Sequence, residues 1–407
     1  MRVGVGYCDN PDTTAAGLQA VSEALQKAGR SDQCDVVLLF ATARHDAQVL
    51  RDAVASAAGA APIVGGGVLG AITNDKFGYA GDQVAAACLW LDGARCDIRA
   101  EGGLLEGEKD VGRRLGLQLK ELGTTPQSPV ILFYGAVDTA GGDVRMFMAT
   151  WILAGIEQGL GFLPGLVGAG LLGDYVITRA KTCQWIGDHV VDHHAMAIAF
   201  SDDIHIDSVI MHGCRPSTSY YTVTKADNQV ILEINGRPAL EFLGELLGSG
   251  IPQESYPFFL ILGVNKGEKW GGFDENNYAS RLCLGLDKER GGIVMFEPDM
   301  VEGTEFQIMY RSIDLEYMKP RLEQTFDRLD GRDPVFALYI DCGGRTAGYG
   351  GIDMEDALVV QNIVADRVPV LGIYTGVEVA SINGRPKGLD WTGIFCLFST
   401  QKRNNGI

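Results

Sequence analysis

The sequence is poor in positive charge. Its 407 residues include 34 lysines and arginines against 52 aspartates and glutamates, which gives a formal net charge of −18 at pH 7. An acidic chain repels phosphate backbones, and the basic residues form no cluster that would reverse this repulsion locally. We therefore expect no binding to nucleic acid.

Paired cysteines and long apolar runs are also missing. The nine cysteines are scattered without a C-x-x-C pair, which excludes a zinc ribbon and is typical of reduced, buried thiols in a cytoplasmic protein. The start MRVGVGYCDN lacks the pattern of a signal peptide. Glu157, Gln158 and Pro164 interrupt the most apolar window, so we predict no membrane insertion.

Glycine, in contrast, is abundant and recurs in a pattern. Three glycine-rich segments match one another: PIVGGGVLGAI (62–72), GLVGAGLLGDY (165–175) and PVLGIYTGVEV (369–379). Each follows an apolar β-branched run and then a helix-periodic segment, which begins at an aspartate suited to capping a helix. A further apolar run comes after each glycine segment. The expected helices cover residues 46–59, 143–159 and 353–366.

This repeating unit predicts the fold class. A crossover through a helix implies that the first two strands of each unit pair in parallel, and the following turn permits an antiparallel third strand. A chain of this length is also too long for one compact core. We predict an α/β fold of two pseudo-similar halves, built from duplicated β-α-β-β modules with mixed sheets. The expected domains are residues 1–209 and 210–407.

The glycines themselves are the first candidate site residues. A glycine lets a ligand or another backbone approach within contact distance, although tight packing of a helix on a strand would also require it. The sequence contains neither a Walker loop nor a G-x-G-x-x-G segment before a helix, so a nucleotide is not indicated. We expect a cleft lined in part by Gly65, Gly66, Gly67, Gly168 and Gly170.

A second candidate is the segment IDCGGRTAGYGG (340–351), directly after an apolar strand. Cys342, Gly343, Gly344 and Arg345 would lie at the carboxyl end of that strand, where parallel α/β sheets bind ligands. Arg345 is suited to clamp a carboxylate, or alternatively to form a surface salt bridge. A catalytic Cys342 would need a base from far away, because no histidine follows His212.

Residues after the third glycine segment complete the predicted cleft. Glu378 lies in a largely apolar strand, where ordinary packing does not explain a carboxylate. We expect it to face the cleft together with Tyr374, Thr375, Trp391 and Thr392.

Histidine is scarce, and only one of the six histidines has a context that suggests a ligand. His212 and Cys214 are two residues apart and would share one face of a strand, where they could bind a metal or haem iron, or simply be buried. In HVVDHH (189–194) the adjacent histidines would point to opposite faces, which argues against a metal site. We expect no metal and no cofactor, with haem at His212 or Cys214 as the alternative.

Taken together, these motifs resemble the FIST family (F-box and intracellular signal transduction proteins), over nearly the whole chain. The N-terminal half matches through VVLLFATARHDAQVL, PIVGGGVLGAI and VAAACLWL, and the C-terminal half through HGCRP, TVTKADNQVILEINGRPALEFLGELLG, CGGR, GIYTGVE and DWTG. One departure is Val377, which intervenes between Gly376 and Glu378, whereas many members have glycine followed directly by glutamate. A one-residue shift would turn the carboxylate away unless a β-bulge restores it.

The resemblance implies a bacterial-type sensory protein with FIST N- and C-terminal domains. Family members are described as sensors of small ligands, with amino acids proposed, and some as haem-containing nitric-oxide sensors. They are often fused to, or encoded beside, histidine kinases, cyclases or chemotaxis components. We therefore expect a stand-alone cytoplasmic sensor, without catalytic residues, that binds an amino acid or another carboxylate and acts through a separate partner. The alternatives are the haem sensor and a thiol-dependent enzyme that uses Cys342.

Overall fold

The computed structural model describes residues 1–30, 32–140, 144–176 and 182–402. Most of these residues belong to three copies of one β-α-β-α-β-β module, which extends the predicted unit by one strand and one helix at its start. The first copy comprises β1 (Arg2–Asp9), α1 (Thr13–Ala28), β2 (Val36–Ala41), α2 (Ala47–Ala58), β3 (Ile63–Gly67) and β6 (Gln83–Trp90). The second comprises β7 (Cys96–Gly102), α3 (Glu108–Glu121), β8 (Pro129–Gly135), α4 (Ala149–Leu160), β11 (Gly165–Leu171) and β14 (His194–Phe200). The third comprises β15 (Ile204–Met211), α7 (Met318–Asp327), β24 (Asp333–Cys342), α9 (Asp356–Val364), β25 (Val370–Ile382) and β27 (Gly393–Thr400).

Strand pairing is the same in all three modules. The orders are β1-β6-β2-β3, β7-β14-β8-β11 and β15-β27-β24-β25, with parallel pairing at β2–β3, β8–β11 and β24–β25. The register matches too, because Gly65 pairs with Leu39, Gly168 with Leu132 and Gly372 with Tyr339. The predicted α/β class with duplicated modules and mixed sheets is confirmed.

The second and third modules join into one sheet. β11 pairs antiparallel with β25, so strands from both halves of the sequence form a single sheet of eleven strands. This sheet also includes β4 (Gly70–Thr73), β5 (Phe77–Tyr79) and β26 (Arg385–Leu389). The first module forms a separate six-stranded sheet with β12 (Gln184–Ile186) and β13 (His189–Val191). The chain enters the third module through β15, which contains residue 210, the expected domain boundary.

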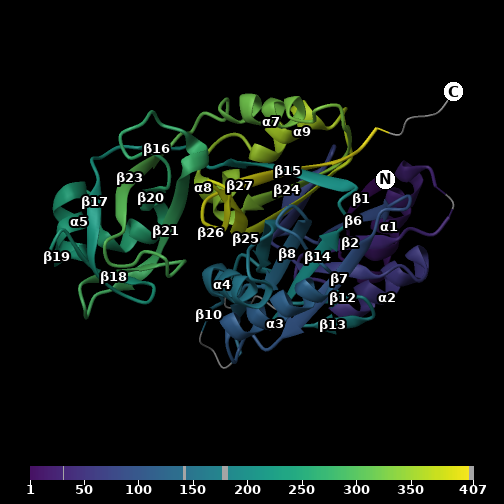
Figure 1. Cartoon of the computed structure of the whole chain (residues 1–407), viewed down its shortest axis with the longest axis horizontal. Helices are drawn as coiled ribbons and strands as arrows, with labels where there is room; N and C mark the ends of the chain where they lie inside the picture. Colours follow the sequence, from purple (N-terminus) through teal and green to yellow (C-terminus); the bar gives the residue numbers. More distant parts are fainter. Residues whose placement is uncertain (31, 141–143, 177–181, 403–407) are drawn as a thin grey trace.

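An antiparallel barrel is inserted in the third module between β15 and α7 and lies at the left of Figure 1. β17, β18, β22, β21, β20 and β23 pair in that order, and β23 closes the ring on β17. Its strands are β16 (Cys214–Pro216), β17 (Tyr221–Asp227), β18 (Val230–Ile234), β19 (Arg237–Pro238), β20 (Ile261–Asn265), β21 (Tyr278–Asp287), β22 (Gly292–Met295) and β23 (Glu305–Arg311). Its helices are α5 (Ala239–Leu247) and α6 (Tyr256–Phe259). The remaining described elements are β9 (Val137–Asp138), β10 (Arg145–Met146), α8 (Ala347–Gly350) and three single 3₁₀ turns at Gln253–Ser255, Glu275–Asn277 and Gly343–Arg345.

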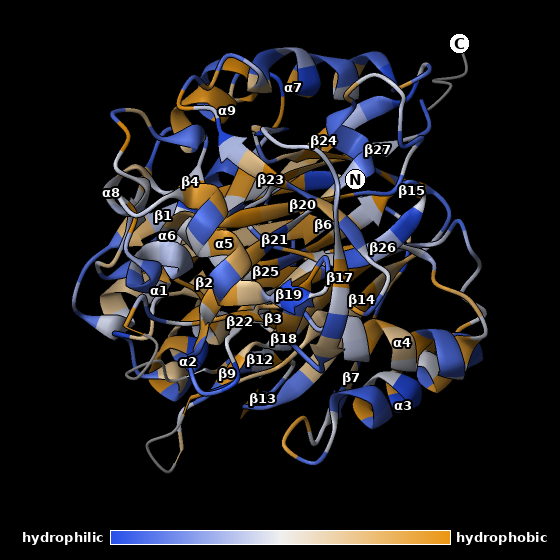
Figure 2. Ribbon diagram, turned by 90° about the vertical axis from the view of Figure 1, so that its left-hand side faces the viewer, coloured by the Kyte–Doolittle hydropathy of each residue, from blue (hydrophilic) through white to orange (hydrophobic). Residues whose placement is uncertain are grey.

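The predicted helices form with shifted starts. Asp46 caps α2 as expected, and its side chain accepts hydrogen bonds from the backbone N–H groups of Gln48 and Val49. Asp143, the expected start of the second helix, lies outside the described residues. α9 begins at Asp356 with Glu355 as its N-cap residue, and not at Asp353. Hydrophobic residues concentrate on the interior strands (Figure 2). No helix within the described ranges is long and apolar enough to cross a membrane.

Close backbone contact explains two of the repeated glycines. A Cβ atom at Gly65 would lie 1.9 Å from the backbone oxygen of Leu39, and one at Gly168 would lie 1.8 Å from that of Leu132. In both cases the atom in the way belongs to the neighbouring parallel strand. The glycine at this module position therefore serves the pairing of β3 and β11 with their neighbours.

Candidate functional site

A cavity of about 140 Å³ lies where all parts of the fold meet. The first module contributes Leu69, the second Leu172 and Tyr175, and the barrel Leu282 and Phe296. The other lining residues are Met146, Asp174, Cys342, Gly343, Gly344, Tyr349, Thr375, Gly376, Val377, Asp390 and Trp391. A molecule bound here would contact three modules and the barrel at once.

Two residues that line the cavity, Asp390 and Trp391, carry unpaired polar atoms. Asp390 Oδ2 accepts a hydrogen bond from the backbone N–H of Leu282 at 3.0 Å, whereas Asp390 Oδ1 and Trp391 Nε1 are buried without a partner among the described residues. Burial raises the pKa of Asp390 from its ordinary 3.8 to about 7, although the positive charge of Arg281 opposes this rise. Two consecutive residues that line the cavity thus carry an unpaired buried acceptor and an unpaired buried donor, and buried polar groups without a partner call for an explanation.

Two strained residues also lie at this cavity. Val377 has φ +55° and Trp391 has φ +56°, the left-handed region that a β-branched or bulky side chain rarely adopts. Such strain is concentrated in functional sites, where surrounding structure holds it in place.

Val377 is the extra residue of a β-bulge. Ala169 pairs with Glu378 and Gly170 with Gly376, so Val377 has no partner on β11. Of the two outcomes that the sequence left open, the structure thus has the β-bulge. It places Val377 in the cavity lining. Glu378 is fully buried and does not line the cavity. The backbone N–H of Thr392 donates to Glu378 Oε2 at 3.3 Å. Burial, and next the charge of Asp390, hold the pKa of Glu378 well above its usual range.

Arg345 lies beside the cavity but contacts only the protein. Nε donates to Asp341 Oδ1 at 3.1 Å, Nη1 to the backbone oxygens of His212 at 3.0 Å and Trp391 at 3.5 Å, and Nη2 to Tyr317 and Asp356. Every guanidinium nitrogen is thus engaged, and Arg345 is not among the lining residues. The role expected for it, a direct clamp on a ligand carboxylate, does not fit this geometry.

Cys342 lines the cavity as a buried thiol. Burial and then the nearby Glu378 raise its pKa well above the ordinary value. Because the thiolate is the reactive form, this environment disfavours the nucleophile that the thiol-dependent alternative requires.

His212 and Cys214 belong to a buried polar turn next to the cavity. The backbone N–H of Cys214 donates to His212 Nδ1 at 2.9 Å, and Glu275 accepts hydrogen bonds from the backbone N–H groups of His212 and Gly213. The groove beside this turn has a volume of about 330 Å³; Cys214, Glu275, Asp314 and Glu316 are among its lining residues, and His212 is not. A haem pocket needs a wide apolar cavity, so these residues do not fit haem.

The remaining predicted residues divide into two groups. One group lines the cavity: Cys342, Gly343, Gly344, Thr375 and Trp391. Tyr374, Thr392, Gly65, Gly66, Gly67, Gly168 and Gly170 are not among the residues that line it. Gly170 nevertheless touches the wall from behind, because Thr375 Oγ1 donates to its backbone oxygen at 2.5 Å.

Sequence reasoning missed several lining residues. Asp390 precedes Trp391 in the DWTG motif, and its position beside a predicted site residue was a usable signal. Leu282 and Phe296 come from the barrel, and their contact with a loop about a hundred residues away has no local pattern in the sequence.

Comparison with known proteins identifies the family. The FIST N domain matches residues 35–237 and the FIST C domain matches residues 239–381. This chain belongs to the FIST family, whose domains are associated with sensing in signal transduction. Similar relatives are an uncharacterised protein of Mycobacterium bovis, 26% identical over 98% of this chain and 99% of that one, and an uncharacterised protein of Mycobacterium tuberculosis, 24% identical over 98% of this chain and 100% of that one.

Two solved structures show weak likeness. A cyanuric acid hydrolase from A. caulinodans aligns with a TM-score of 0.26 at 13% identity, over 49% of this chain and 71% of that one. A chorismatase aligns with a TM-score of 0.33 at 9% identity, over 98% of this chain and 99% of that one. Likenesses this low say nothing about the activity of this chain.

Proposed function

We propose that this protein is a cytoplasmic sensor that binds a small ligand in the cavity and passes the signal to a separate protein. The observation that carries the proposal is the convergence of three modules and the barrel on one cavity with unpaired polar atoms and two strained residues. A ligand at such a junction can change how the parts sit together, which is what a sensor requires. The proposal needs no cofactor and no catalytic residue.

The wall chemistry favours an amino acid as the ligand. Asp390 Oδ1 can accept hydrogen bonds from an ammonium group, and Trp391 Nε1 can donate to a carboxylate. A carboxylate without an amine would bring no positive charge of its own to the carboxyl group of Asp390. The volume of about 140 Å³ limits the ligand to a small one, since cavities of about 150 Å³ hold a molecule the size of benzene.

Hydrogen bonds of Arg345 connect the cavity wall with the helices α7 and α9. Its Nη1 reaches the backbone oxygen of Trp391 in the wall, and its Nη2 reaches Tyr317 at the start of α7 and Asp356 at the start of α9. We propose that the partner, such as a histidine kinase, a cyclase or a chemotaxis component, responds at these helices. The nine free cysteines agree with a reducing compartment.

Isothermal titration of glycine, alanine and other small amino acids tests the proposal. Wild type should show saturable binding, and Asp390→Asn should weaken it about tenfold or more, the value of a charged hydrogen bond. Leu172→Phe should abolish binding because it fills the cavity, while Leu246→Phe, on the exposed face of α5, should leave it unchanged. If no small amino acid binds wild type at millimolar concentration, or if Leu172→Phe binds normally, the proposal is wrong.

A further inference from the structure

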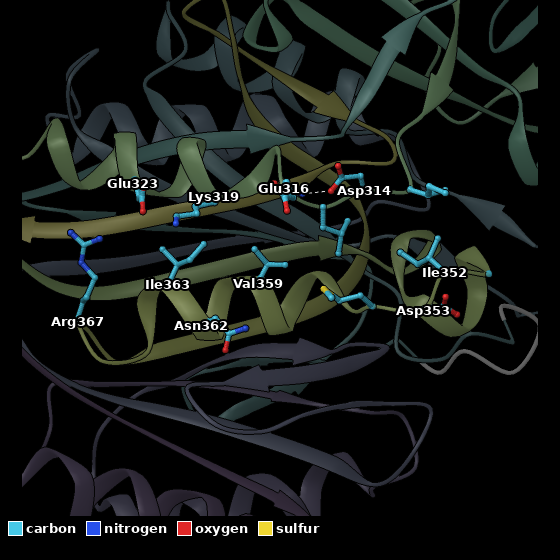
Figure 3. Close-up of a pocket in the computed structure, with 14 residues that line it drawn as sticks. Asp314, Glu316, Lys319, Glu323, Ile352, Asp353, Val359, Asn362, Ile363 and Arg367 are labelled. Carbon is cyan, nitrogen blue, oxygen red and sulfur yellow. Dashed lines mark hydrogen bonds between the residues drawn. The ribbon is translucent and has the colours of Figure 1, made fainter.

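A long groove separates the two helices of the third module (Figure 3). It has a volume of about 970 Å³ and lies between α7 and α9. The lining residues are Ile313, Asp314, Leu315, Glu316, Lys319, Glu323, Gly351, Ile352, Asp353, Met354, Val359, Asn362, Ile363 and Arg367. Figure 3 shows side chains from both helices projecting into the space between them.

The equivalent helices of the other modules pack closely, because glycines bring them together. In the second module, a Cβ atom at Gly112 of α3 would lie 2.1 Å from the backbone oxygen of Ile152, and one at Gly155 of α4 would lie 2.1 Å from that of Lys109. In the first module, Gly17 of α1 lies against Leu50 and Ala53 of α2. The sequences of α7 and α9 contain no glycine. The groove is therefore a feature of the third module, and the shared fold does not require it.

Apolar side chains form part of the groove lining: Ile313, Leu315, Ile352, Met354, Val359 and Ile363. Val359 and Ile363 of α9 are half-buried on its floor. At one end Ile313 is 79% exposed and Met354 is 52% exposed, so large apolar side chains face solvent beside the floor. Apolar side chains spaced along a helical groove are the receptor half of helix-in-groove recognition.

The groove is also acidic. Its lining includes four carboxylates, Asp314, Glu316, Glu323 and Asp353, and two cations, Lys319 and Arg367. Within the part of the chain that the structure describes, none of these four carboxylates forms an ion pair. Some other surface carboxylates are paired, as Glu241 and Glu245 are with Arg237. The free negative charge on the groove complements a basic partner.

We infer that this groove binds an amphipathic helix with a basic edge, supplied by a separate signalling protein. The apolar face of that helix covers Ile313, Met354 and Ile363, and its lysines or arginines lie against Glu316 and Glu323. α7 has ten residues, so a helix of about three turns matches the groove in length. Arg345 holds the first turns of both groove helices through Tyr317 and Asp356, which places the docked helix next to the proposed route from the cavity.

This inference rests on one part of the proposed function, namely that the sensor passes its signal to a separate protein. It is tested without ligand. The probe is a stapled helical peptide of about 11 residues, with leucines on one face and lysines on both edges, labelled for fluorescence anisotropy. A second peptide carries glutamate in place of every lysine. The staple removes most of the cost of ordering the helix, so weak intrinsic helicity does not mask binding.

The lysine peptide should bind wild type saturably, and the glutamate peptide about tenfold more weakly or worse. Met354→Glu and Glu323→Lys should each weaken the lysine peptide about fivefold or more. Leu117→Glu and Glu121→Lys, exposed positions on α3 of the closed helix pair, are the matched controls and should have no effect. A failed ligand titration would leave these results unaltered.

Three outcomes would overturn the inference. The first is that neither peptide binds at about 0.1 mM, where a specific groove is well occupied. The second is that both peptides bind alike, or that the α3 controls weaken binding as much as the groove variants. The third is that wild type is a dimer in light scattering and Met354→Glu is a monomer, because the groove would then hold a second copy of this chain.

Discussion

The helix pairs α3–α4 and α7–α9 occupy the same place in their modules, yet they are held in opposite ways. In the second module, glycines of each helix touch the backbone of the other, and the pair is closed. In the third module, a groove of about 970 Å³ lies between the helices, and one buried guanidinium, Arg345, binds a side chain at the start of each. The modules thus share strand order and register, but their helix pairs differ: one is closely packed and the other leaves a groove.

The largest loss of stability should come from removing Arg345, the guanidinium that binds the starts of α7 and α9. Arg345→Met leaves Asp341 and Asp356, both fully buried, without their cation, which should lower the free energy of unfolding by about 3–5 kcal/mol. Chemical denaturation monitored by circular dichroism measures this loss. Arg290→Met is the control, because Arg290 pairs with Asp227 and Asp287 on the surface, and should cost less than about 1 kcal/mol. Equal losses in the two variants would show that Arg345 does not hold the third module together.

The pH dependence of stability should reveal the buried Asp390. Its pKa is raised from 3.8 to about 7, so between these values the folded protein keeps a proton that the unfolded chain releases. The free energy of unfolding should therefore fall as pH rises from about 4 to about 7, and this penalty, on the order of 4 kcal/mol, stays complete above pH 7.

Measuring the free energy of unfolding against pH in Asp390→Asn isolates the contribution of Asp390. The variant should lose clearly less stability than wild type between about pH 4 and about pH 8; burial also raises the pKa of Asp341, to about 8, so part of the decline remains. Asp327→Asn at the exposed end of α7 should behave as wild type. A variant whose pH profile is parallel to that of wild type would exclude a protonated Asp390 from the folded protein.

A smaller loss of stability should come from replacing the glycines at which the closed helix pairs touch. In Gly155→Ala the new methyl group meets the backbone of α3, which should cost about 1–3 kcal/mol. Gly17→Ala should cost less, because the nearest atom, 3.0 Å away, is the Cδ1 of Leu50, the end of a flexible side chain. The control is Gly244→Ala in α5, where the nearest atom lies 3.4 Å away; there alanine should be neutral or stabilising by up to about 1 kcal/mol. Thermal denaturation of the three variants orders them, and a reversed order would contradict close packing as the reason for Gly155.

The module repeat could be predicted from the sequence because its signals are local. Glycine spacing placed Gly65, Gly168 and Gly372 at one module position, and strand register confirms that placement. The inserted residue Val377 also marked where a β-bulge could form; the bulge is present, but Glu378 is not among the residues that line the cavity. Patterns of this kind depend on neighbours along the strand, where alternation and spacing carry the information.

The site could be predicted only in part, because it depends on contacts between distant segments. Cys342 and Trp391 were found through their motifs. Arg345 was expected to face a ligand, since nothing near it in the sequence shows that Tyr317 and Asp356 take its donors. The contribution of Leu282 follows from a barrel insertion that only the tertiary structure reveals.

The central claim is that Asp390 and Trp391 select a small ligand that carries an amine. Calorimetric titration of alanine and of propionate, its analogue without the amine, tests this claim most directly at about pH 6 and about pH 8. Alanine should bind about tenfold more tightly at the higher pH, because Asp390 ionises around pH 7, and propionate, which the ionised Asp390 repels, should not bind at about pH 8. Propionate binding as tight as that of alanine at about pH 8, or alanine binding that is equal at the two pH values, would contradict the account.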